Sequence, residues 1–212
     1  MNVKELIAKR AAKELKKGSV INLGIGIPTL VTKFINPNDY HIHTENGLLG
    51  MKELDDQNHY DPLIVNAGKM AVGECRGASY FDSATSFGMI RGGHIDVAIL
   101  GALQVDESGQ IANWAIPGKN ILGVGGAMDL LNGAKKVIVT VLHTAKDGSI
   151  KLVKNCDYPI TSVRPVDMII TELAVFKRVN DEWVLIEVMP GSSVEEIREK
   201  TAFNFSIEEE SM

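Results

Sequence analysis

The 212-residue sequence is poor in cysteine and aromatic residues, and it carries no excess of positive charge. Its two cysteines, Cys75 and Cys156, are too few for a disulfide framework and lack the spacing of metal ligands. We expect both to be small buried residues without a catalytic role. The net charge of −5 argues against a nucleic-acid-binding surface, which requires a basic face.

The sequence also lacks segments that would direct the chain to a membrane or anchor it there. No run approaches the ~20 apolar residues of a membrane-spanning helix. Residues 1–17 have no apolar signal-peptide core, and they include Glu5 and Glu14, whereas transit peptides are poor in acidic residues. We therefore expect a cytoplasmic protein with no membrane partner. The 45% of hydrophobic residues is typical of a globular protein with one sizeable core.

Apolar runs alternate with helical patterns and glycine turns along the chain. Helical spacing predicts a helix over residues 3–16, and the continuous run Val97–Leu100 is typical of a strand covered on both faces. Residues 51–62 predict a polar loop, and Leu63–Val65 predicts a buried strand. Further strands are expected at 19–23, 40–44, 135–142, 168–171, 174–178 and 183–187, and further helices at 30–35, at 80–90 and from Ser193 onwards. The pattern predicts a single open α/β domain over residues 1–212 with a largely parallel central sheet.

One stretch combines a strand with a turn and a carboxylate. Ile42 and Thr44 alternate with polar residues, which predicts a strand, and Asn46-Gly47 readily adopts positive φ. Glu45 therefore stands at the tip of a strand, where rigid structure can aim it at a cleft. On the stretch alone, a hairpin turn beside a solvated glutamate is the more usual interpretation, and the rest of the chain is needed to favour a catalytic Glu45.

Glycine turns follow other strands. The strand at 19–23 runs into Gly24 and Gly26, and Pro28 suits the first position of a helix, an arrangement that brings ligands close to backbone amides. The dinucleotide-binding fingerprint is not met, because Thr29 stands where it requires a third glycine. A lone Gly-x-Gly is weak support for any ligand.

Two more turns carry residues of interest. Lys69 ends the turn that starts at Asn66, and it is either a binding residue or a solvated surface lysine. Gly125 and Gly126 close a long irregular segment, of a length that is usually functional or disordered. Ligands of open α/β sheets bind outside the carboxyl ends of the strands. We therefore expect Asn22, Glu45, Lys69 and the Gly125-Gly126 pair to converge at one edge.

Six motifs in this order resemble a known family. They are Asn22–Pro28 (NLGIGIP), Glu45–Gly50 (ENGLLG), Asn66–Lys69 (NAGK), Ile90–His94 (IRGGH), Asn113-Trp114 with Pro117–Lys119 (NW, PGK), and Gly125–Asp129 (GGAMD). Together they resemble the B, or beta, subunit of bacterial 3-oxoacid CoA-transferases and the C-terminal half of the fused succinyl-CoA:3-ketoacid enzyme. The resemblance extends from about residue 3 to about residue 206.

The resemblance implies a CoA-transferase-like fold in which Glu45 is the nucleophile. It implies that the Gly126 amide helps to form an oxyanion hole, in which a glutamine of a partner chain, the A subunit, is the second donor. It further implies a heterodimer or heterotetramer with the A subunit, with coenzyme A as a substrate and no metal or other cofactor. The residues expected to bind substrate or CoA are Asn22, Gly24, Gly26, Asn46, Gly47, Lys69, Gly125 and Gly126.

The chain departs from the family pattern at two places. Thr44 stands where the family usually has serine, which keeps the hydroxyl, and Met51–Glu53 replaces a glycine-proline continuation after Gly50. Alternative functions are an acyl-CoA hydrolase or a sugar-phosphate isomerase on a similar fold, and a non-catalytic partner subunit. The sequence does not identify the acids that are exchanged.

Overall fold

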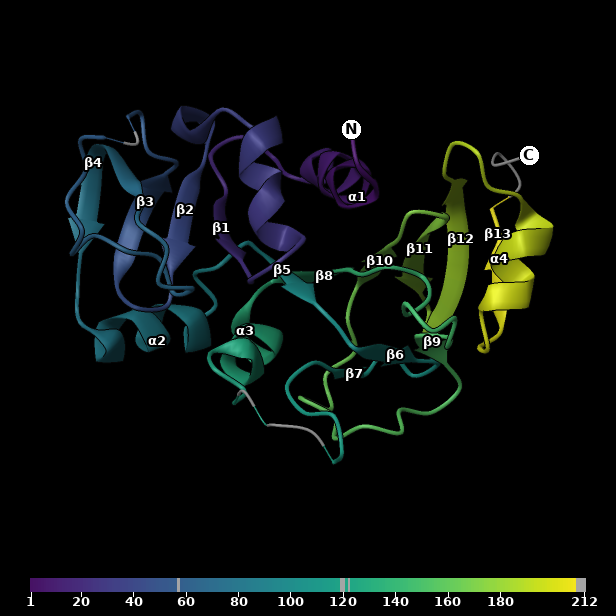
Figure 1. Ribbon diagram of the computed structural model, residues 1–212. Helices are drawn as coiled ribbons and strands as arrows, with labels where there is room; N and C mark the ends of the chain where they lie inside the picture. Colours follow the sequence, from purple (N-terminus) through teal and green to yellow (C-terminus); the bar gives the residue numbers. More distant parts are fainter. Residues whose placement is uncertain (57, 119–120, 122, 209–212) are drawn as a thin grey trace.

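The computed structural model describes residues 1–56, 58–118, 121 and 123–208 (Figure 1). Lys119 of the Pro117–Lys119 motif and the end of the tail at 209–212 lie outside the described residues. No helix in the described ranges is both long and apolar enough to cross a membrane.

The described residues form a ten-stranded sheet, a three-stranded sheet and several helices. The large sheet contains β1 (Val20–Leu23), β2 (His41–Thr44), β3 (Leu48–Lys52), β4 (Gly73–Tyr80), β5 (Val97–Gly101), β8 (Lys136–Thr140), β10 (Met168–Ile170), β11 (Ala174–Val179), β12 (Glu182–Val188) and β13 (Phe205–Ile207). The small sheet contains β6 (Gln104–Asp106), β7 (Ile111–Ala112) and β9 (Leu152–Val153). The helices are α1 (Val3–Ala12), α2 (Ser83–Arg91), α3 (Ala127–Gly133) and α4 (Val194–Lys200), with 3₁₀ helices η1 (Pro28–Phe34) and η2 (Pro37–Asp39).

The centre of the large sheet is parallel and its flanks are mixed. The strand order is β13-β12-β11-β10-β8-β5-β1-β2-β3-β4. Strands β2, β1, β5, β8 and β10 run parallel, whereas β3 and β4 on one side and β11 on the other pair antiparallel. This confirms the predicted α/β fold. After β1 the chain forms β2 on one side of it and later β5 on the other side, so the strand order reverses at β1. Open α/β sheets bind their ligands at such a reversal point.

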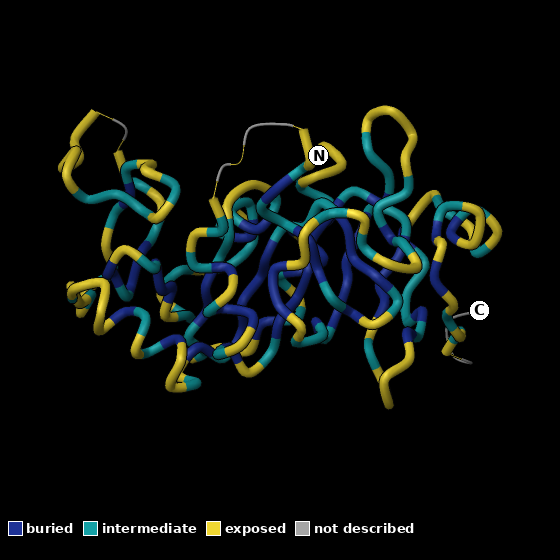
Figure 2. Tube along the Cα trace, turned by 90° about the horizontal axis from the view of Figure 1, so that it is seen from below, coloured by how far each residue is buried: buried dark blue, intermediate teal, exposed yellow. Residues whose placement is uncertain are grey.

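Both faces of the central strands are covered, which explains their continuous apolar sequences. Ala98 and Leu100 of β5 belong to a core with residues of α2, α3 and α4. The alternate residues Val97 and Ile99 belong to a second core with residues of α1 and η1. Figure 2 shows the buried parts of the chain concentrated in the middle of the molecule, with exposed residues at the loops. The helices thus enclose the parallel strands from two sides.

The segment after Glu45 differs from the sequence prediction. Met51 and Lys52 continue strand β3 rather than starting a loop, and Met51 is buried. The predicted buried strand at 63–65 is wrong: Leu63 is 87% exposed, and Val65 forms only an isolated bridge with Ala71. The apolar run is instead a surface segment beside the turn at 66–69.

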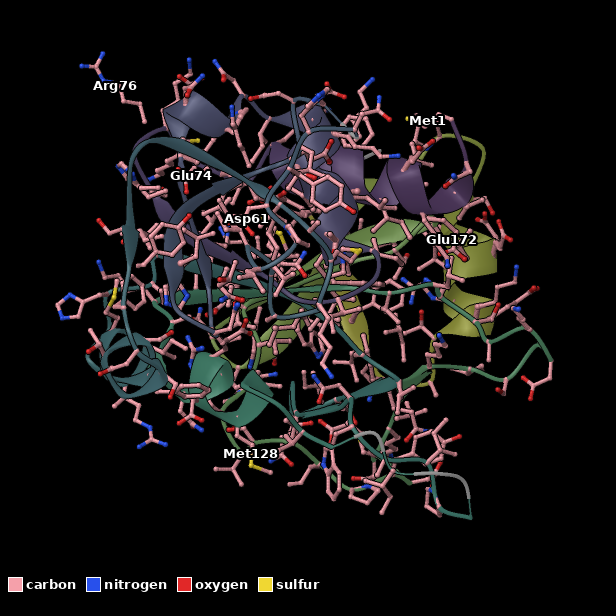
Figure 3. The ribbon with its side chains drawn as sticks, turned by 60° about the vertical axis from the view of Figure 1, so that its left-hand side comes forward. Met1, Asp61, Glu74, Arg76, Met128 and Glu172 are labelled. Carbon is pink, nitrogen blue, oxygen red and sulfur yellow. The ribbon has the colours of Figure 1, made fainter. Side chains whose placement is uncertain are left out.

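Strand β4 is absent from the sequence prediction because it is an exposed edge strand. Its sequence contains two glycines, and all of its residues are exposed or half-buried, so it lacks an apolar signature. Figure 3 shows Arg76 of this strand pointing away from the molecule. Charged residues such as Glu74 and Arg76 discourage further strand pairing at a free edge. Helix boundaries also differ, since α1 ends at Ala12 and α2 begins at Ser83.

A buried histidine, His143, joins the segments that follow β8, β10 and α4. His143, beyond β8, is hydrogen-bonded through Nδ1 to Thr171 Oγ1 and through Nε2 to Thr201 Oγ1, both at 2.9 Å. Thr171 directly follows β10 and Thr201 directly follows α4. Burial lowers the pKa of His143 to about 4. The neutral ring therefore holds the C-terminal helix against the sheet.

We expect this histidine to make the fold sensitive to acid. The pKa of His143 is about 4 in the folded chain, against a reference value of 6.5. Its contribution to the free energy of unfolding is therefore complete above pH 6.5 and is lost as pH falls towards 4. The difference corresponds to about 3 kcal/mol. Denaturant unfolding at pH 7 and pH 4.5 should show a smaller loss of stability in His143→Gln than in the unmodified chain. The exposed His94→Gln is the control; an equal loss in both variants would contradict the expectation.

Candidate active site

Glu45 is the first residue after β2, in the turn that joins β2 to β3. Strand β2 pairs with β1 on one side and β3 on the other, so its end is held by backbone hydrogen bonds. The turn is closed by the Gly47 amide, which donates to the Thr44 carbonyl at 3.0 Å. Glu45 itself is half-buried, whereas Asn46 is exposed. The carboxylate thus stands on rigid backbone at the carboxyl end of a central strand.

Gly47 allows a close approach that no other residue permits. Its φ is +116°, and a Cβ atom built on it would lie 1.9 Å from the carbonyl oxygen of Phe81. The Phe81 amide donates to the Gly47 carbonyl at 3.0 Å. The Glu45 turn is therefore locked against the segment that leads into α2.

Gly126 lies directly against the Glu45 side chain, although 81 residues separate them (126 − 45). A Cβ atom on Gly126 would lie 2.9 Å from Glu45 Cγ and 3.3 Å from Oε1. Gly126 caps the start of α3, and Gly125 before it is exposed with φ +54°. The absence of a side chain at 126 makes the space that Glu45 occupies.

Asn22 lies behind Glu45 on β1. Its side chain is fully buried, and in the strand register it stands opposite His43. Burial raises the pKa of Glu45, while its own backbone N–H and a hydrogen bond from the Asn22 side chain oppose that rise. The net result is a carboxyl group whose pKa lies above the usual range and whose ionised form is supported by an amide.

The glycine turns lie close to one another. The Gly24 amide donates to the Ile99 carbonyl at 2.9 Å, which ties the loop after β1 to β5, and Gly26 is exposed. Asn46 Nδ2 donates to the Val65 carbonyl at 2.7 Å. A Cβ atom on Gly68 would lie 3.5 Å from Ile25 Cγ1. The loop after β1, the Glu45 turn and the turn at 66–69 are therefore neighbours.

Lys69 is exposed, with φ +62°. Among the described residues it forms no ion pair, with Glu45 or with any other carboxylate. The structure thus brings Asn22, Glu45 and Gly126 together and leaves Lys69 on a neighbouring turn.

Two buried polar residues beside this site are absent from the sequence prediction. His43 Nδ1 lies 3.1 Å from Asn22 Nδ2, and His43 Nε2 lies 3.1 Å from Ser86 Oγ. Ser86 is on α2, 43 residues further along the chain, and only the fold brings it near. The one local signal is a histidine two residues before Glu45, in the same strand.

The cysteines are half-buried rather than fully buried as predicted. Cys75 Sγ contacts the Pro37 carbonyl at 3.8 Å, and Cys156 Sγ contacts the Gln110 carbonyl at 3.8 Å. Burial raises the pKa of Cys156 to about 12, so its thiolate is not available near neutral pH.

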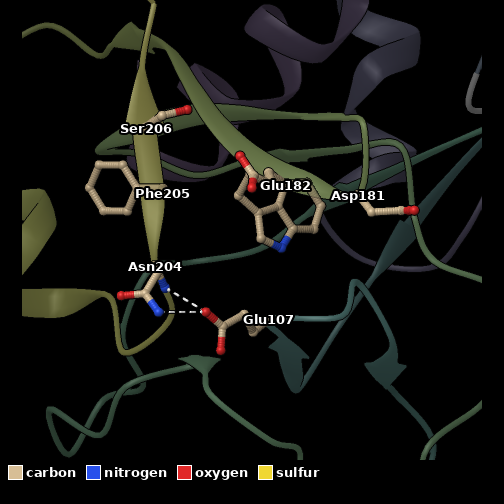
Figure 4. A pocket seen from close by; sticks show the side chains of 7 residues that line it. Glu107, Asp181, Glu182, Asn204, Phe205 and Ser206 are labelled. Atoms are coloured by element: carbon tan, nitrogen blue, oxygen red, sulfur yellow. Dashed lines mark hydrogen bonds between the residues drawn. The ribbon is translucent and has the colours of Figure 1, made fainter.

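A hollow of about 330 Å³ lies elsewhere, at the starts of β12 and β13 (Figure 4). Glu107 on its wall accepts hydrogen bonds from the amide and from Nδ2 of Asn204, at 3.1 and 2.8 Å. Several strands separate this hollow from β2 in the sheet order. It therefore does not belong to the site around Glu45.

Comparison with known proteins identifies the family. The profile of the family described as coenzyme A transferase matches residues 4–200. The chain is 49% identical over 203 residues to the B subunit of the probable succinyl-CoA:3-ketoacid coenzyme A transferase of Bacillus subtilis, covering 95% of this chain and 94% of that protein. It is 46% identical to the beta subunit of the acetate CoA-transferase of Escherichia coli, covering 98% and 95%.

Solved structures of CoA-transferases have the same fold as this chain. An acyl-CoA transferase of Escherichia coli O157:H7 superposes with a TM-score of 0.80 at 26% identity, over 99% of this chain and 42% of that one. The chain therefore spans less than half of that larger protein. Glutaconate coenzyme A-transferase from Acidaminococcus fermentans, at 20% identity and a TM-score of 0.70, shares the fold.

The chain belongs to the coenzyme A transferase family. Within that family, it corresponds to the subunit that its curated bacterial relatives call B or beta.

Two of the positive-φ glycines around the site, Gly47 and Gly26, should respond differently to substitution. Gly47→Ala should lose about 3 kcal/mol or more of stability, because the methyl group collides with the Phe81 carbonyl. Gly26→Ala meets nothing within 4 Å, so backbone strain alone should cost about 1–2 kcal/mol. Denaturant unfolding measures both variants. Equal losses would mean that the contact with Phe81 does not constrain the turn.

Proposed function

We propose that this chain is the glutamate-bearing subunit of a two-subunit enzyme that moves CoA between an acyl-CoA and a 3-oxoacid or short-chain carboxylic acid. The observation that carries the proposal is the Glu45 carboxylate, half-buried at the end of β2, against the Gly126 backbone and within reach of the Asn22 amide. The relatives named for succinyl-CoA with a 3-ketoacid, and for acetate, support this range of substrates.

The first half of the reaction transfers CoA to the enzyme. The Glu45 carboxylate attacks the thioester carbonyl, the C–S bond breaks, and CoA thiolate leaves behind an acyl-glutamyl anhydride. The thiolate then attacks the glutamyl carbonyl of the anhydride and releases the first acid as a carboxylate. Glu45 now carries CoA as a thioester. Covalent catalysis of this kind divides one difficult exchange into easier steps.

The second half reverses these steps with another acid. The incoming carboxylate attacks the glutamyl thioester, expels CoA thiolate and forms a new anhydride, and the thiolate attacks its acyl carbonyl. The new acyl-CoA leaves and Glu45 is regenerated as a carboxylate. A relative solved as a thioester complex with CoA, an acyl-CoA transferase of E. coli at 26% identity, supports a thioester intermediate.

The surroundings of Glu45 suit this chemistry. Each tetrahedral intermediate carries an oxyanion, and the Gly126 amide is the donor that we assign to it, a contribution of roughly 3–4 kcal/mol. A glutamine of the A subunit is the expected second donor. Burial limits the access of water, which would otherwise hydrolyse the thioester.

An acyl-CoA hydrolase would use the same carboxylate but complete the reaction with water. It would release free CoA without an acceptor acid, whereas a transferase requires one. An isomerase would form no adduct with CoA. A non-catalytic subunit would retain activity in the complex when Glu45 is replaced. These outcomes separate the alternatives with one set of assays.

Exposed apolar residues beside the site support the presence of a partner chain. Ile25, in the loop after β1, is 73% exposed, and Leu63 is 87% exposed. The segment that contains Leu63 adjoins the Glu45 turn, because the Val65 carbonyl accepts a hydrogen bond from Asn46. Ile25 lies next to Gly68, in the turn that follows this segment. Relatives that carry the designation B or beta are parts of larger assemblies by name. We assign this surface to contact with the A subunit.

The isolated chain should therefore be inactive. Adding the A subunit should restore transfer, and Leu63→Asp should weaken the complex because a charge replaces an exposed apolar contact. Size-exclusion chromatography with activity assays measures both effects, with Val163→Asp, on an exposed residue of a different segment, as the control. Full turnover by the chain alone would contradict the assignment.

The nucleophile is tested by trapping. Acyl-CoA given to the two-subunit complex without an acceptor should leave CoA on Glu45, and borohydride should reduce that thioester to an alcohol that peptide mass spectrometry detects. Glu45→Gln should abolish both the label and the exchange, because a neutral amide is a far poorer nucleophile.

The exposed Glu199→Gln is the matched control and should keep both the label and the exchange. A label on the A subunit, or normal exchange by Glu45→Gln, would place the nucleophile elsewhere. A panel of acyl-CoA donors and acceptor acids, assayed on the same complex, identifies the substrates.

A further inference from the structure

Helix α3 has a glycine at each end, and the backbone conformation requires neither of them. Gly126 precedes the helix with φ −81° and makes no side-chain cap hydrogen bond, and Gly133 is the last helical residue. Neither has the positive φ that favours glycine. A glycine within a helix is destabilising relative to alanine, and serine or asparagine would cap the helix better. Another constraint must therefore explain both glycines.

At each position the space that a side chain would fill is already occupied. Gly126 lies against the Glu45 side chain, with 2.9 Å between the position of a Cβ atom and Glu45 Cγ. A Cβ atom on Gly133 would lie 2.1 Å from the carbonyl oxygen of Ile90 and 3.2 Å from Arg91 Cα, at the end of α2. The backbones of the two helices therefore touch where both helices end. Figure 1 shows α2 and α3 side by side on one face of the large sheet.

An ion pair joins the two helices between these glycines. Arg91 Nε lies 2.5 Å from Asp129 Oδ1. Asp129 and Gly133 follow Gly126 by three and seven residues (129 − 126 and 133 − 126), a spacing that places all three on one face of a helix. This face of α3 thus meets the proposed nucleophile at its start and α2 further along.

Helix α2 reaches the same turn by its other end. The segment that leads into it is held there by the close contact of Gly47 with the Phe81 carbonyl. The contacts form a closed ring, in which the start of α2 holds the turn, α2 meets α3 where both end, and the start of α3 returns to the Glu45 side chain. The junction of the helices lies roughly 10 Å along α3 from Gly126, at a rise of about 1.5 Å per residue. The space around Glu45 therefore depends on a contact remote from it.

We propose that Gly133 and the Arg91–Asp129 pair position the nucleophile: they seat α3 on α2 and thereby hold Gly126 against the Glu45 side chain. The inference rests on the proposed role of Glu45. It gives a role to Arg91 and Asp129, which stand in two of the six motifs and take no part in the proposed chemistry.

Movement of α3 should affect the reaction more than the binding of substrate. The Gly126 amide is the donor that we assign to the oxyanion, and a misplacement of about 1 Å can slow a reaction roughly a hundredfold. Because the oxyanion develops only in the transition state, a displaced donor lowers kcat more than it raises KM.

The main test is Gly133→Ala in the two-subunit complex. The methyl group collides with the Ile90 carbonyl, so α3 must move, and kcat should fall about tenfold or more while KM for acyl-CoA stays within about threefold. Gly109→Ala is the matched control, because Gly109 lies between β6 and β7 with φ +85° and its Cβ atom would lie 2.9 Å from Pro165 Cβ. It should lose stability in denaturant unfolding and keep kcat.

The ion pair provides a milder test in case Gly133→Ala does not fold. Asp129→Asn and Arg91→Ala should each lower kcat about threefold with little change in KM, a modest effect because the Arg91 side chain is 70% exposed. The double variant should lose no more than either single variant, because both changes break one contact. Additive losses, or an unchanged kcat in all three variants, would contradict a role for the pair.

Borohydride trapping on Glu45 in the unmodified complex is run first. Its failure would reject the nucleophile and with it the proposed function. Trapping at Glu45, together with an unchanged kcat in a folded Gly133→Ala complex and in the Arg91 and Asp129 variants, would overturn the positioning role alone.

Discussion

The parallel pairing of β1 with β2 is the constraint on which the site depends. It sets Asn22 directly opposite His43 and delivers Glu45 one residue beyond the end of β2. Gly47 then turns the chain against Phe81 so closely that no side chain fits between them. The carboxylate is therefore positioned by backbone hydrogen bonds and by one close backbone contact, which deform less than surface loops do.

The burial of Glu45 is unfavourable for its charge and suitable for its chemistry. Burial disfavours the ionised carboxylate, and the Asn22 amide offsets part of that effect. In the proposed anhydride and thioester, the glutamyl group is neutral, so the penalty disappears once the covalent bond has formed. The site thus disfavours the starting carboxylate relative to the acylated states, in agreement with a nucleophile that must react and be regenerated.

The sequence predicts the parts that carry strong local signals. Val97–Leu100 is apolar throughout because both faces of β5 are covered, and Glu45 stands out because Asn46-Gly47 marks the turn. Strand β4 lacks such a signal, since an exposed edge needs no apolar residues. Leu63–Val65 misleads because it forms no strand: Leu63 is exposed, and Ile64 and Val65 are only half-buried. The contact of Ser86 with His43 joins residues far apart in the chain that share no sequence pattern, so only tertiary structure shows it. The order of strands and turns predicts Gly126 at the same edge as Glu45, and tertiary structure adds the direct contact between them.

The sheet order also affects how the chain can fold during synthesis. Ile21 of β1 pairs with Ile42 on one side but with Val97 on the other, 76 residues later (97 − 21). At about 5–20 residues per second, a ribosome needs roughly 4–15 s to supply that second neighbour. Throughout this interval, the central strand exposes an apolar edge with unpaired amides, the kind of surface that recruits wrong partners. Chaperone protection of the nascent chain therefore matters most before β5 emerges.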